Sequence, residues 1–370
     1  MNWARISIIL KRLDWGMVFC ILLLLAVGIL FIYSAACRGE DVPSAPFHRK
    51  QMLWALVGAG FFLATAFTDY RHLRDAAWWL YFVALLLLVL VLLVGKEMYG
   101  ARRWLNLFGI HVQPSEFAKL ATIVVVARFL GRPGRSLDEP VRIFQVLALV
   151  AVPFLLIVKE PDLGTAAMLI PVAFMMMFAA GVPVKYMLIL GAVGLLLLPF
   201  GWFFLGNYQK ERVLVFLDAN RDPLGAGWNK IQSGIAVGSG GPTGKGYLKG
   251  TQNVLGFLPR TVAPTDFIYS VIAEETGFVG SIVLLILYAL LLGSGIRAGL
   301  LARDKFGRLL AVGVTSLLFC HVFVNMAMTI GLLPITGLPL PLISYGGSFM
   351  ISIMIGLGIV QSVFVRRYHE

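Results

Sequence analysis

The sequence predicts an all-α polytopic membrane protein, and three observations carry that prediction. Hydrophobic residues make up 59% of the 370 residues, charged residues make up 14%, and the mean hydropathy is +0.86. A soluble domain has about 45–50% apolar and about 25% charged residues. The apolar residues form continuous runs of the length that crosses a bilayer, about 20 residues per helix. They do not alternate with polar residues as the strands of a membrane barrel do.

About ten transmembrane helices are expected within a single integral membrane domain, residues 1–370. The fourth and fifth runs are short and carry charges. A long polar segment, residues 206–264, separates the seventh run from the eighth. In order, the predicted spans are 16–36, 50–68, 76–95, 115–131, 142–158, 164–181, 184–205, 267–295, 309–331 and 345–365.

The short connections between these spans predict the orientation. Those on the side of the two termini hold sixteen Lys and Arg residues, and those on the opposite side hold seven. Because short cytoplasmic loops are enriched in Lys and Arg, both termini are expected in the cytoplasm. The 206–264 segment then faces outward. The net charge of +12 suits contact with anionic membrane lipids and requires no nucleic acid.

The 206–264 segment is too long to be an ordinary connection, and long loops are often functional. Its two apolar patches, Val213 to Leu217 and Ile231 to Val237, are expected to form interfacial or re-entrant helices. The glycine-rich stretch at 238–246 neither follows a strand nor has the spacing of a nucleotide-binding P-loop. A nucleotide-driven pump is therefore disfavoured.

Asp266 is the most informative residue, because it lies where the long polar segment meets the apolar run that begins at Phe267. A carboxylate at the end of a transmembrane helix is costly unless it caps the helix or takes part in chemistry. Both roles are open at this stage. Asp is an ordinary helix N-cap, and Asp is also a common general base.

Glu116 and Lys119 stand three residues apart at the start of the fourth span. That spacing places them on one helix face, within reach of each other. Either they form a structural ion pair between helices, or Lys119 faces a polar cavity and binds a phosphate. An isolated charge at mid-membrane costs at least about 2.5–3.5 kcal/mol, so a pair near the interface is the less costly arrangement.

Other polar groups cluster at the ends of spans. Arg102 and Arg103 beside Trp104 suit anionic head groups and sugar faces, or form an interfacial aromatic anchor. Asp162 could cap the sixth span. Arg212 and Lys245 are cations in the long segment, where a solvated face is the usual explanation.

The segment that enters the last span contains Ser344 and two glycines, which favour close packing and also allow contact with a substrate. The three cysteines form no disulfide framework, and the sequence contains no Cys/His cluster with metal-ligand spacing.

Together these segments resemble the SEDS family (shape, elongation, division and sporulation proteins), and its RodA branch more than the division-type, FtsW-like branch. They occur in the family's order. The resemblance rests on Gly100-Ala101-Arg102-Arg103-Trp104-Leu105, Gln113-Pro114-Ser115-Glu116-Phe117-Ala118-Lys119, Pro161-Asp162-Leu163-Gly164-Thr165, Asp222-Pro223-Leu224-Gly225-Ala226-Gly227, Gly250-Thr251-Gln252, Thr265-Asp266-Phe267-Ile268, Ala273-Glu274-Glu275-Thr276-Gly277, and Pro339-Leu340-Pro341 with Ser344-Tyr345-Gly346-Gly347.

One segment departs from the family pattern. The family usually has Phe-Leu-Pro-Glu-x-His-Thr-Asp-Phe, whereas here residues 260–264 lie between Pro259 and Thr265. The Glu and the His are absent, and the connection is two residues longer. Any helper role of those two groups does not carry over, but Asp266 is in place.

The resemblance implies a peptidoglycan glycosyltransferase that polymerises lipid II, an undecaprenyl-pyrophosphate-linked disaccharide pentapeptide, on the outer face of the cytoplasmic (inner) membrane, for cell elongation and rod shape. A class B penicillin-binding protein, which is a transpeptidase, is the implied partner. Asp266 is then the base that activates the acceptor sugar hydroxyl. The candidates for binding substrate are Lys119, Glu116, Arg212, Lys245, Trp104, Arg102, Arg103, Asp162, Gln232 and Ser344.

Direct displacement would invert the anomeric centre. A divalent cation, Mg²⁺ or Mn²⁺, on the pyrophosphate is compatible with this chemistry, although the sequence shows no dedicated ligand set. Two other classes of function stay open, a lipid II flippase and a noncatalytic scaffold of the cell-wall machinery. Transporters often have related halves with broken helices, and no such duplication is visible.

Overall fold

The computed structural model describes residues 9–37, 46–98, 101–107, 109–132, 139–222, 224–259 and 262–368. The predicted all-α polytopic fold is confirmed. Two apolar helices, α5 (Pro114–Leu130) and α8 (Val184–Phe204), match the fourth and seventh predicted spans. The described residues also include eight helices that are long and apolar enough to cross a membrane: α2 (Trp15–Ala36), α3 (Phe47–Phe67), α4 (Arg71–Val94), α6 (Pro140–Lys159), α7 (Leu163–Ala180), α12 (Ile268–Leu300), α13 (Lys305–Thr329) and α14 (Gly347–Val365).

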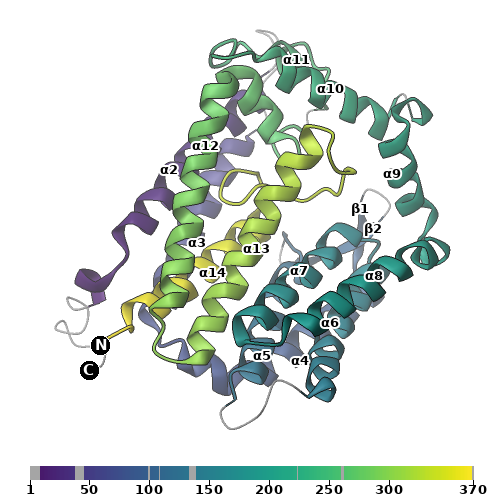
Figure 1. Ribbon diagram of the computed structural model, residues 1–370. Helices are drawn as coiled ribbons and strands as arrows, with labels where there is room; N and C mark the ends of the chain where they lie inside the picture. Colours follow the sequence, from purple (N-terminus) through teal and green to yellow (C-terminus); the bar gives the residue numbers. More distant parts are fainter. Residues whose placement is uncertain are drawn as a thin grey trace.

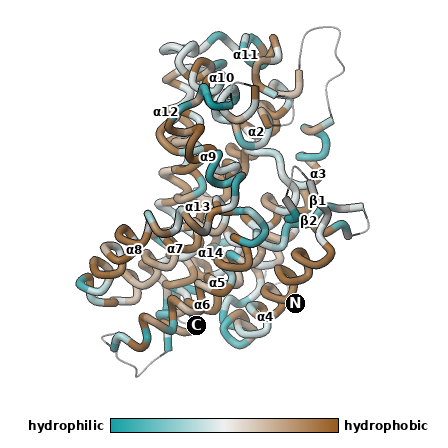
Figure 2. Tube along the Cα trace, turned by 90° about the vertical axis from the view of Figure 1, so that its right-hand side faces the viewer, coloured by the Kyte–Doolittle hydropathy of each residue, from teal (hydrophilic) through white to brown (hydrophobic). Residues whose placement is uncertain are grey.

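The two last helices, α13 and α14, form the centre of the bundle (Figure 1). In the most apolar 18 residues of α13 and α14, 78% and 89% of the residues are buried, whereas the corresponding shares in α3 and α4 are 22% and 28%. Both α3 and α4 turn large apolar side chains outward. Figure 2 shows hydrophobic residues along most of α4, α6 and α8. Small residues allow close packing inside the bundle: a Cβ added to Gly28 would lie 2.7 Å from the Cα of Ile343.

Three helix ends meet at one end of the bundle. The Asp14 carboxylate, which caps α2, pairs with Arg297 in the last turn of α12 at 2.5 Å. The guanidinium of Arg367, just after α14, donates to the carbonyl of Arg12 at 3.2 Å. Since Asp266 precedes the first residue of α12, it belongs to the opposite end of the bundle.

The sequence did not predict the small antiparallel sheet between α4 and α5. Its strands are β1 (Lys96–Met98), β2 (Ala101–Leu107) and β3 (Ile110–Val112), in the order β1-β2-β3. Strands were dismissed because the apolar runs do not alternate, but that criterion applies only to the membrane-spanning segments. Gly109, at φ +84°, supplies the turn between β2 and β3. The sheet presents Arg102, Arg103 and Trp104 on β2.

The long segment between α8 and α12 contains α9 (Asn207–Leu217), the 3₁₀ turn η1 (Ala219–Arg221), α10 (Ala226–Ser239) and α11 (Thr251–Val254). Helices were expected at the two apolar patches, and α9 and α10 confirm them. Figure 1 shows α9, α10 and α11 at one end of the bundle.

The glycine-rich stretch of this segment fits into a break in α12. Gly277 has non-helical angles there, with φ +65°. The Phe278 amide donates to the Gly241 carbonyl at 2.8 Å, and the Gly246 amide donates to the Glu275 carbonyl at 3.0 Å. A Cβ on Gly244 would lie 2.1 Å from the same Glu275 carbonyl. The glycines are therefore required by close backbone contact with α12.

Candidate active site

Asp266 lies in the turn before α12, but it does not cap that helix. Phe267 is the N-cap residue, and no side chain forms a cap hydrogen bond there. The interpretation of Asp266 as an N-cap is therefore wrong, because α12 begins one residue later than that role requires. The residue is partly buried, and its carboxylate accepts no hydrogen bond from the described part of the chain.

The Asp266 carboxylate and the Arg212 guanidinium both lie close to Gly337. A Cβ placed on Gly337, whose φ is +74°, would lie 3.5 Å from Asp266 Oδ2 and 3.7 Å from Arg212 Nη1. Arg212, on α9, also donates from Nη1 to the Ile335 carbonyl at 3.0 Å. Glycine at 337 thus keeps open the space between an acid and a cation that come from different parts of the chain.

The surroundings of Asp266 set its protonation. Burial raises the pKa of Asp266 to about 6, and the negative charge of Asp162 raises it further. The positive charges of Arg212 and Arg103 lower it. A carboxyl group with a pKa near 6 is ionised at neutral pH and is a stronger base than an ordinary Asp, which suits proton abstraction.

Side chains from α13 and from the loop after it hold the backbone around Asp266. Asn325, buried on α13, donates from Nδ2 to the Asp266 carbonyl at 2.9 Å and to the Leu338 carbonyl at 2.7 Å. Ser344 donates to the Thr265 carbonyl at 2.5 Å and accepts from the Leu340 amide at 2.7 Å. The loop that carries Gly337 is thereby tied to the turn that carries Asp266.

A second set of groups comes from β2 and from the connection between α6 and α7. Arg103 donates from Nε to the Glu160 carbonyl at 3.1 Å, and its other end bonds the Pro161 carbonyl. Asp162 caps α7 by accepting from the Thr165 amide at 3.2 Å, so the capping interpretation is confirmed for this residue. Asp162 also accepts from Gln113 Nε2 at 3.2 Å.

Glu160 differs from its neighbours because it is fully buried and neither carboxyl oxygen has a hydrogen-bond partner among the described residues. Burial raises the pKa of Glu160 to about 8, the charge of Asp162 raises it too, and Arg103 lowers it. The side chain is therefore a neutral carboxylic acid at neutral pH.

Glu116 and Lys119 form the ion pair that their spacing predicts, with 3.0 Å between Lys119 Nζ and Glu116 Oε1. Lys119 Nζ also lies 2.8 Å from His321 Nε2, and His321 Nδ1 lies 3.3 Å from the Pro339 carbonyl. An ammonium donor at Nε2 assigns the ring proton to Nδ1, which can then donate to Pro339. The Lys119 side chain has no exposed surface, so phosphate binding by Lys119 stays a prediction that requires the loop over it to move.

The remaining predicted residues lie around these two groups. Lys245 pairs with Glu274 at 2.7 Å and contacts the Thr251 hydroxyl at 2.7 Å, so its ammonium is committed to the network around α12. Gln232 is buried on α10, which packs against α12. On β2, Trp104 is half-buried and Arg102 is exposed. The two residues at 260–261, within the segment that departs from the family pattern, lie outside the described residues.

Sequence reasoning missed His321, Asn325 and Gly337. His321 and Asn325 were detectable as polar residues four apart in an apolar span, which places them on one helix face, and polar groups inside spans mark functional sites. Nothing in the sequence distinguishes Gly337 from the other glycines. Among the described residues, no group of three or more His, Cys, Asp or Glu side chains could hold a metal ion.

Fold and site define a polytopic membrane protein with a carboxylate at one end of its bundle that accepts no hydrogen bond from the described chain and feels the charges of two arginines. The family model described as "Cell cycle protein" (FtsW, RodA and SpoVE) matches residues 14–369, and the chain belongs to that family. It is 40% identical over 360 residues to the Escherichia coli K12 protein named peptidoglycan glycosyltransferase MrdB, covering 96% of this chain and 94% of that one.

A second relative comes from another branch. The Geobacter metallireducens protein named probable peptidoglycan glycosyltransferase FtsW is 37% identical over 372 residues, covering 96% of each chain. Among solved structures, a chain from "Structural coordination of polymerization and crosslinking by a peptidoglycan synthase complex" is similar with a TM-score of 0.82. It is 34% identical and covers 97% of this chain and 99% of that one.

Proposed function

We propose that this protein is a peptidoglycan glycosyltransferase of the RodA type, which polymerises lipid II with Asp266 as the general base. The observation that carries the proposal is the Asp266 carboxylate, which has its pKa raised to about 6, has no hydrogen-bond partner in the described chain and lies, like Arg212, close to Gly337. Relatives named peptidoglycan glycosyltransferases match nearly the whole chain, which supports this class of activity.

The proposed reaction joins two lipid-linked sugars. Asp266 takes the proton of the acceptor sugar 4-hydroxyl, whose oxygen attacks the anomeric carbon of the donor. The new glycosidic bond forms as the bond from that carbon to the pyrophosphate breaks, and undecaprenyl pyrophosphate leaves with the bonding electrons. The displacement inverts the anomeric centre, and Asp266 returns its proton to solvent.

Arg212 and Arg103 are proposed to stabilise the charge that develops on the departing pyrophosphate. Fixed cations in a site shielded from water stabilise such charge strongly, because they need no reorganisation during the reaction. Both guanidiniums also bond backbone carbonyls, which fixes their positions: Arg212 bonds Ile335, and Arg103 bonds Glu160.

A divalent cation, Mg²⁺ or Mn²⁺, remains part of the proposal. Mg²⁺ at phosphate substrates is usually held by one or two carboxylates together with the phosphates themselves. The open oxygens of Asp266 fit that requirement, and Asp162, whose charge acts on the pKa of Asp266, is the candidate second carboxylate. Bound there, the ion would add positive charge at the leaving group.

We also propose the location and the partner. The protein spans the inner membrane with both termini in the cytoplasm and the Asp266 end outside, which the distribution of Lys and Arg supports. A cysteine placed at residue 243 should react with an impermeant reagent on intact cells, and one at residue 303 should not. A class B penicillin-binding protein is the proposed partner, since a similar chain belongs to a complex that couples polymerization to crosslinking.

Purified protein with labelled lipid II tests the proposal against its two alternatives. Glycan polymer is expected in detergent and in vesicles. Movement of lipid II across the vesicle membrane without polymer would instead identify a flippase. If neither polymer nor movement occurs, including with the partner transpeptidase present, the protein is a scaffold and the proposal fails.

A further inference from the structure

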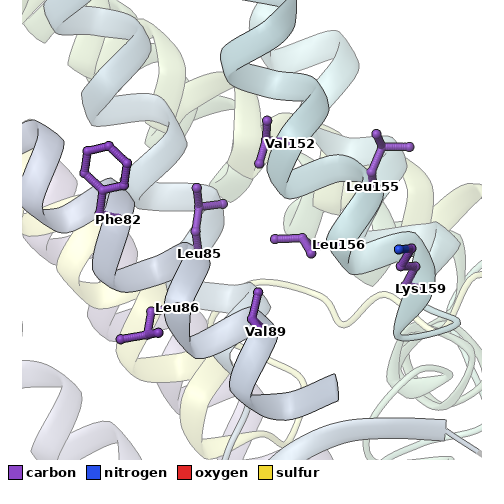
Figure 3. Close-up of a pocket in the computed structure, with 8 residues that line it drawn as sticks. All are labelled: Phe82, Leu85, Leu86, Val89, Val152, Leu155, Leu156 and Lys159. Carbon is purple, nitrogen blue, oxygen red and sulfur yellow. The ribbon is translucent and has the colours of Figure 1, made fainter. Parts of the chain in front are cut away.

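An apolar groove runs between α4 and α6 on the outside of the bundle, away from the Asp266 site. It has a volume of about 580 Å³. Figure 3 shows Leu85 and Val89 of α4 facing Val152 and Leu156 of α6 across the gap. Pockets of about 300–1,000 Å³ are large enough for a small ligand, and here the ligand must come from the hydrocarbon of the bilayer.

The groove is long enough to hold part of an acyl chain of one leaflet. Its α4 wall runs from Phe82 to Val89, which is eight residues and a rise of about 10 Å along the helix. The hydrocarbon of one leaflet is about 15 Å thick. Phe82 and Val89 are both exposed. A lipid acyl chain can therefore enter sideways from the bilayer and lie along the groove.

One polar side chain, Lys159, ends the groove. It is the last residue of α6 and the only charged residue among the eight lining residues, all of which are described. Lys159 is exposed, and no described residue forms a hydrogen bond or ion pair with its ammonium. A favourable interaction with the helix dipole accounts for a Lys at this position, but it leaves all three N–H donors available to a ligand.

The charges next to Lys159 favour an anion. Glu160 is buried and, with its pKa raised to about 8, carries no charge at neutral pH. Negative charge on a lipid head group at this level would meet the Lys159 ammonium and an uncharged Glu160.

We infer that this groove binds one anionic phospholipid of the surrounding bilayer, with an acyl chain between α4 and α6 and the head-group phosphate on Lys159. Lys159 is not one of the groups that the proposed reaction uses, and the inference does not depend on the proposed function.

Native mass spectrometry of delipidated protein tests this inference. The probes are dioleoyl-phosphatidylglycerol and dioleoyl-phosphatidylcholine, which share acyl chains and differ in net charge. We expect one phosphatidylglycerol to bind about fivefold more tightly than phosphatidylcholine, the factor that corresponds to ~1 kcal/mol for one basic residue at a membrane surface. Lys159→Gln should abolish the preference, and Lys185→Gln, at an exposed lysine beginning α8, should keep it.

A matched pair of substitutions on α4 tests whether an acyl chain lies in the groove. Val89, inside the groove, and Val83, outside it, are 40% and 51% exposed, so both positions accept a larger side chain. Val89→Trp should weaken binding of both lipids at least tenfold, and Val83→Trp should not. If Val89→Trp does not fold, the comparison of Lys159→Gln with the wild-type protein decides alone whether the groove binds an anionic phospholipid.

Three results would overturn the inference. The wild-type protein could bind both phospholipids equally, or Lys159→Gln could retain the preference. Displacement of phosphatidylglycerol by an equimolar amount of undecaprenyl phosphate would assign the groove to an isoprenoid chain instead. Polymerisation in lipid-free detergent should stay within twofold of wild type in Lys159→Gln, because Lys159 lies outside the proposed catalytic groups.

Discussion

The Asp266 region and the Lys119 region both hold ionised side chains inside a membrane protein, but they satisfy them differently. Lys119 is completely buried and bonds Glu116 and His321. The Asp266 carboxylate accepts no hydrogen bond from the described chain, and it lies close to Gly337, as does the Arg212 guanidinium. A buried charge without a partner is costly, so the group that persists without one is the group to which we assign the chemistry.

The two regions are also connected. The Lys119 pair supports His321, which bonds the Pro339 carbonyl two residues from Gly337. Asn325 ties the carbonyl of Leu338 to that of Asp266. The Lys119 region, whose charges are paired, therefore supports the loop that carries Gly337 and lines the Asp266 region. Substitutions in the two regions should therefore affect polymerisation to different extents.

Asp266→Asn should have the largest effect on polymerisation. Asn cannot take the acceptor proton, and loss of a general base costs about 10²–10⁴-fold in rate. The variant should fold normally, since Phe267 and not Asp266 is the N-cap of α12. Asp266→Ala should be equally inactive and, for the same reason, should not show the ~1 kcal/mol loss of stability that follows removal of a cap. Near-wild-type synthesis by Asp266→Asn would remove Asp266 from the mechanism.

The double change Glu116→Gln with Lys119→Met tests the supporting region. Replacing a buried ion pair by uncharged groups of similar volume often preserves stability, whereas breaking one partner costs about 3–5 kcal/mol. The double variant should therefore fold, but polymerisation should fall about 10²-fold because the loop over His321 shifts, and a displacement near 1 Å has that effect. Full activity would mean that the pair only locks helices together. The single variant Lys119→Met should be the less stable protein in a thermal melt.

Asn325→Ala should lower kcat about tenfold and leave KM within about twofold. The change leaves the carbonyls of Asp266 and Leu338 without their donor, which loosens the position of Asp266 without touching the substrate. Thr315→Val on the same helix is a matched control, because the Thr315 hydroxyl has no partner among the described residues. Equal effects of the two changes on kcat would contradict a positioning role.

Glu160→Gln should have the smallest effect, less than twofold on polymerisation at pH 7, because Glu160 is already uncharged there. Its folded-state pKa of about 8 lies above the ordinary value of 4.5, so the folded protein binds the proton more tightly than the unfolded chain. Wild-type stability should therefore decline as the pH rises from about 4.5 to about 8. Melting temperatures over that range should show a smaller decline in Glu160→Gln.

Sequence reasoning succeeded where one local signal was sufficient. Continuous apolar runs predict ten helices because each span must satisfy its own backbone in the bilayer, and the spacing of Glu116 and Lys119 predicts their pairing. It failed where the partner comes from a distant segment. The Lys245 ammonium bonds Glu274, 29 residues away, and Asn325 bonds the Asp266 carbonyl, 59 residues away. The sheet at β1–β3 was missed because its strands lie outside the apolar runs on which strands were judged.

The pH dependence of kcat/KM tests the central claim, that Asp266 acts as a base whose pKa is tuned by its neighbours. Polymerisation by the purified wild-type protein between pH 4.5 and 8.5 should rise with pH and level off above an apparent pKa of about 6, because only the ionised carboxylate accepts a proton. Arg212→Gln should move that midpoint upward, since the Arg212 charge lowers the pKa of Asp266. A rate that is constant or falling from pH 5 to pH 7 would contradict this assignment.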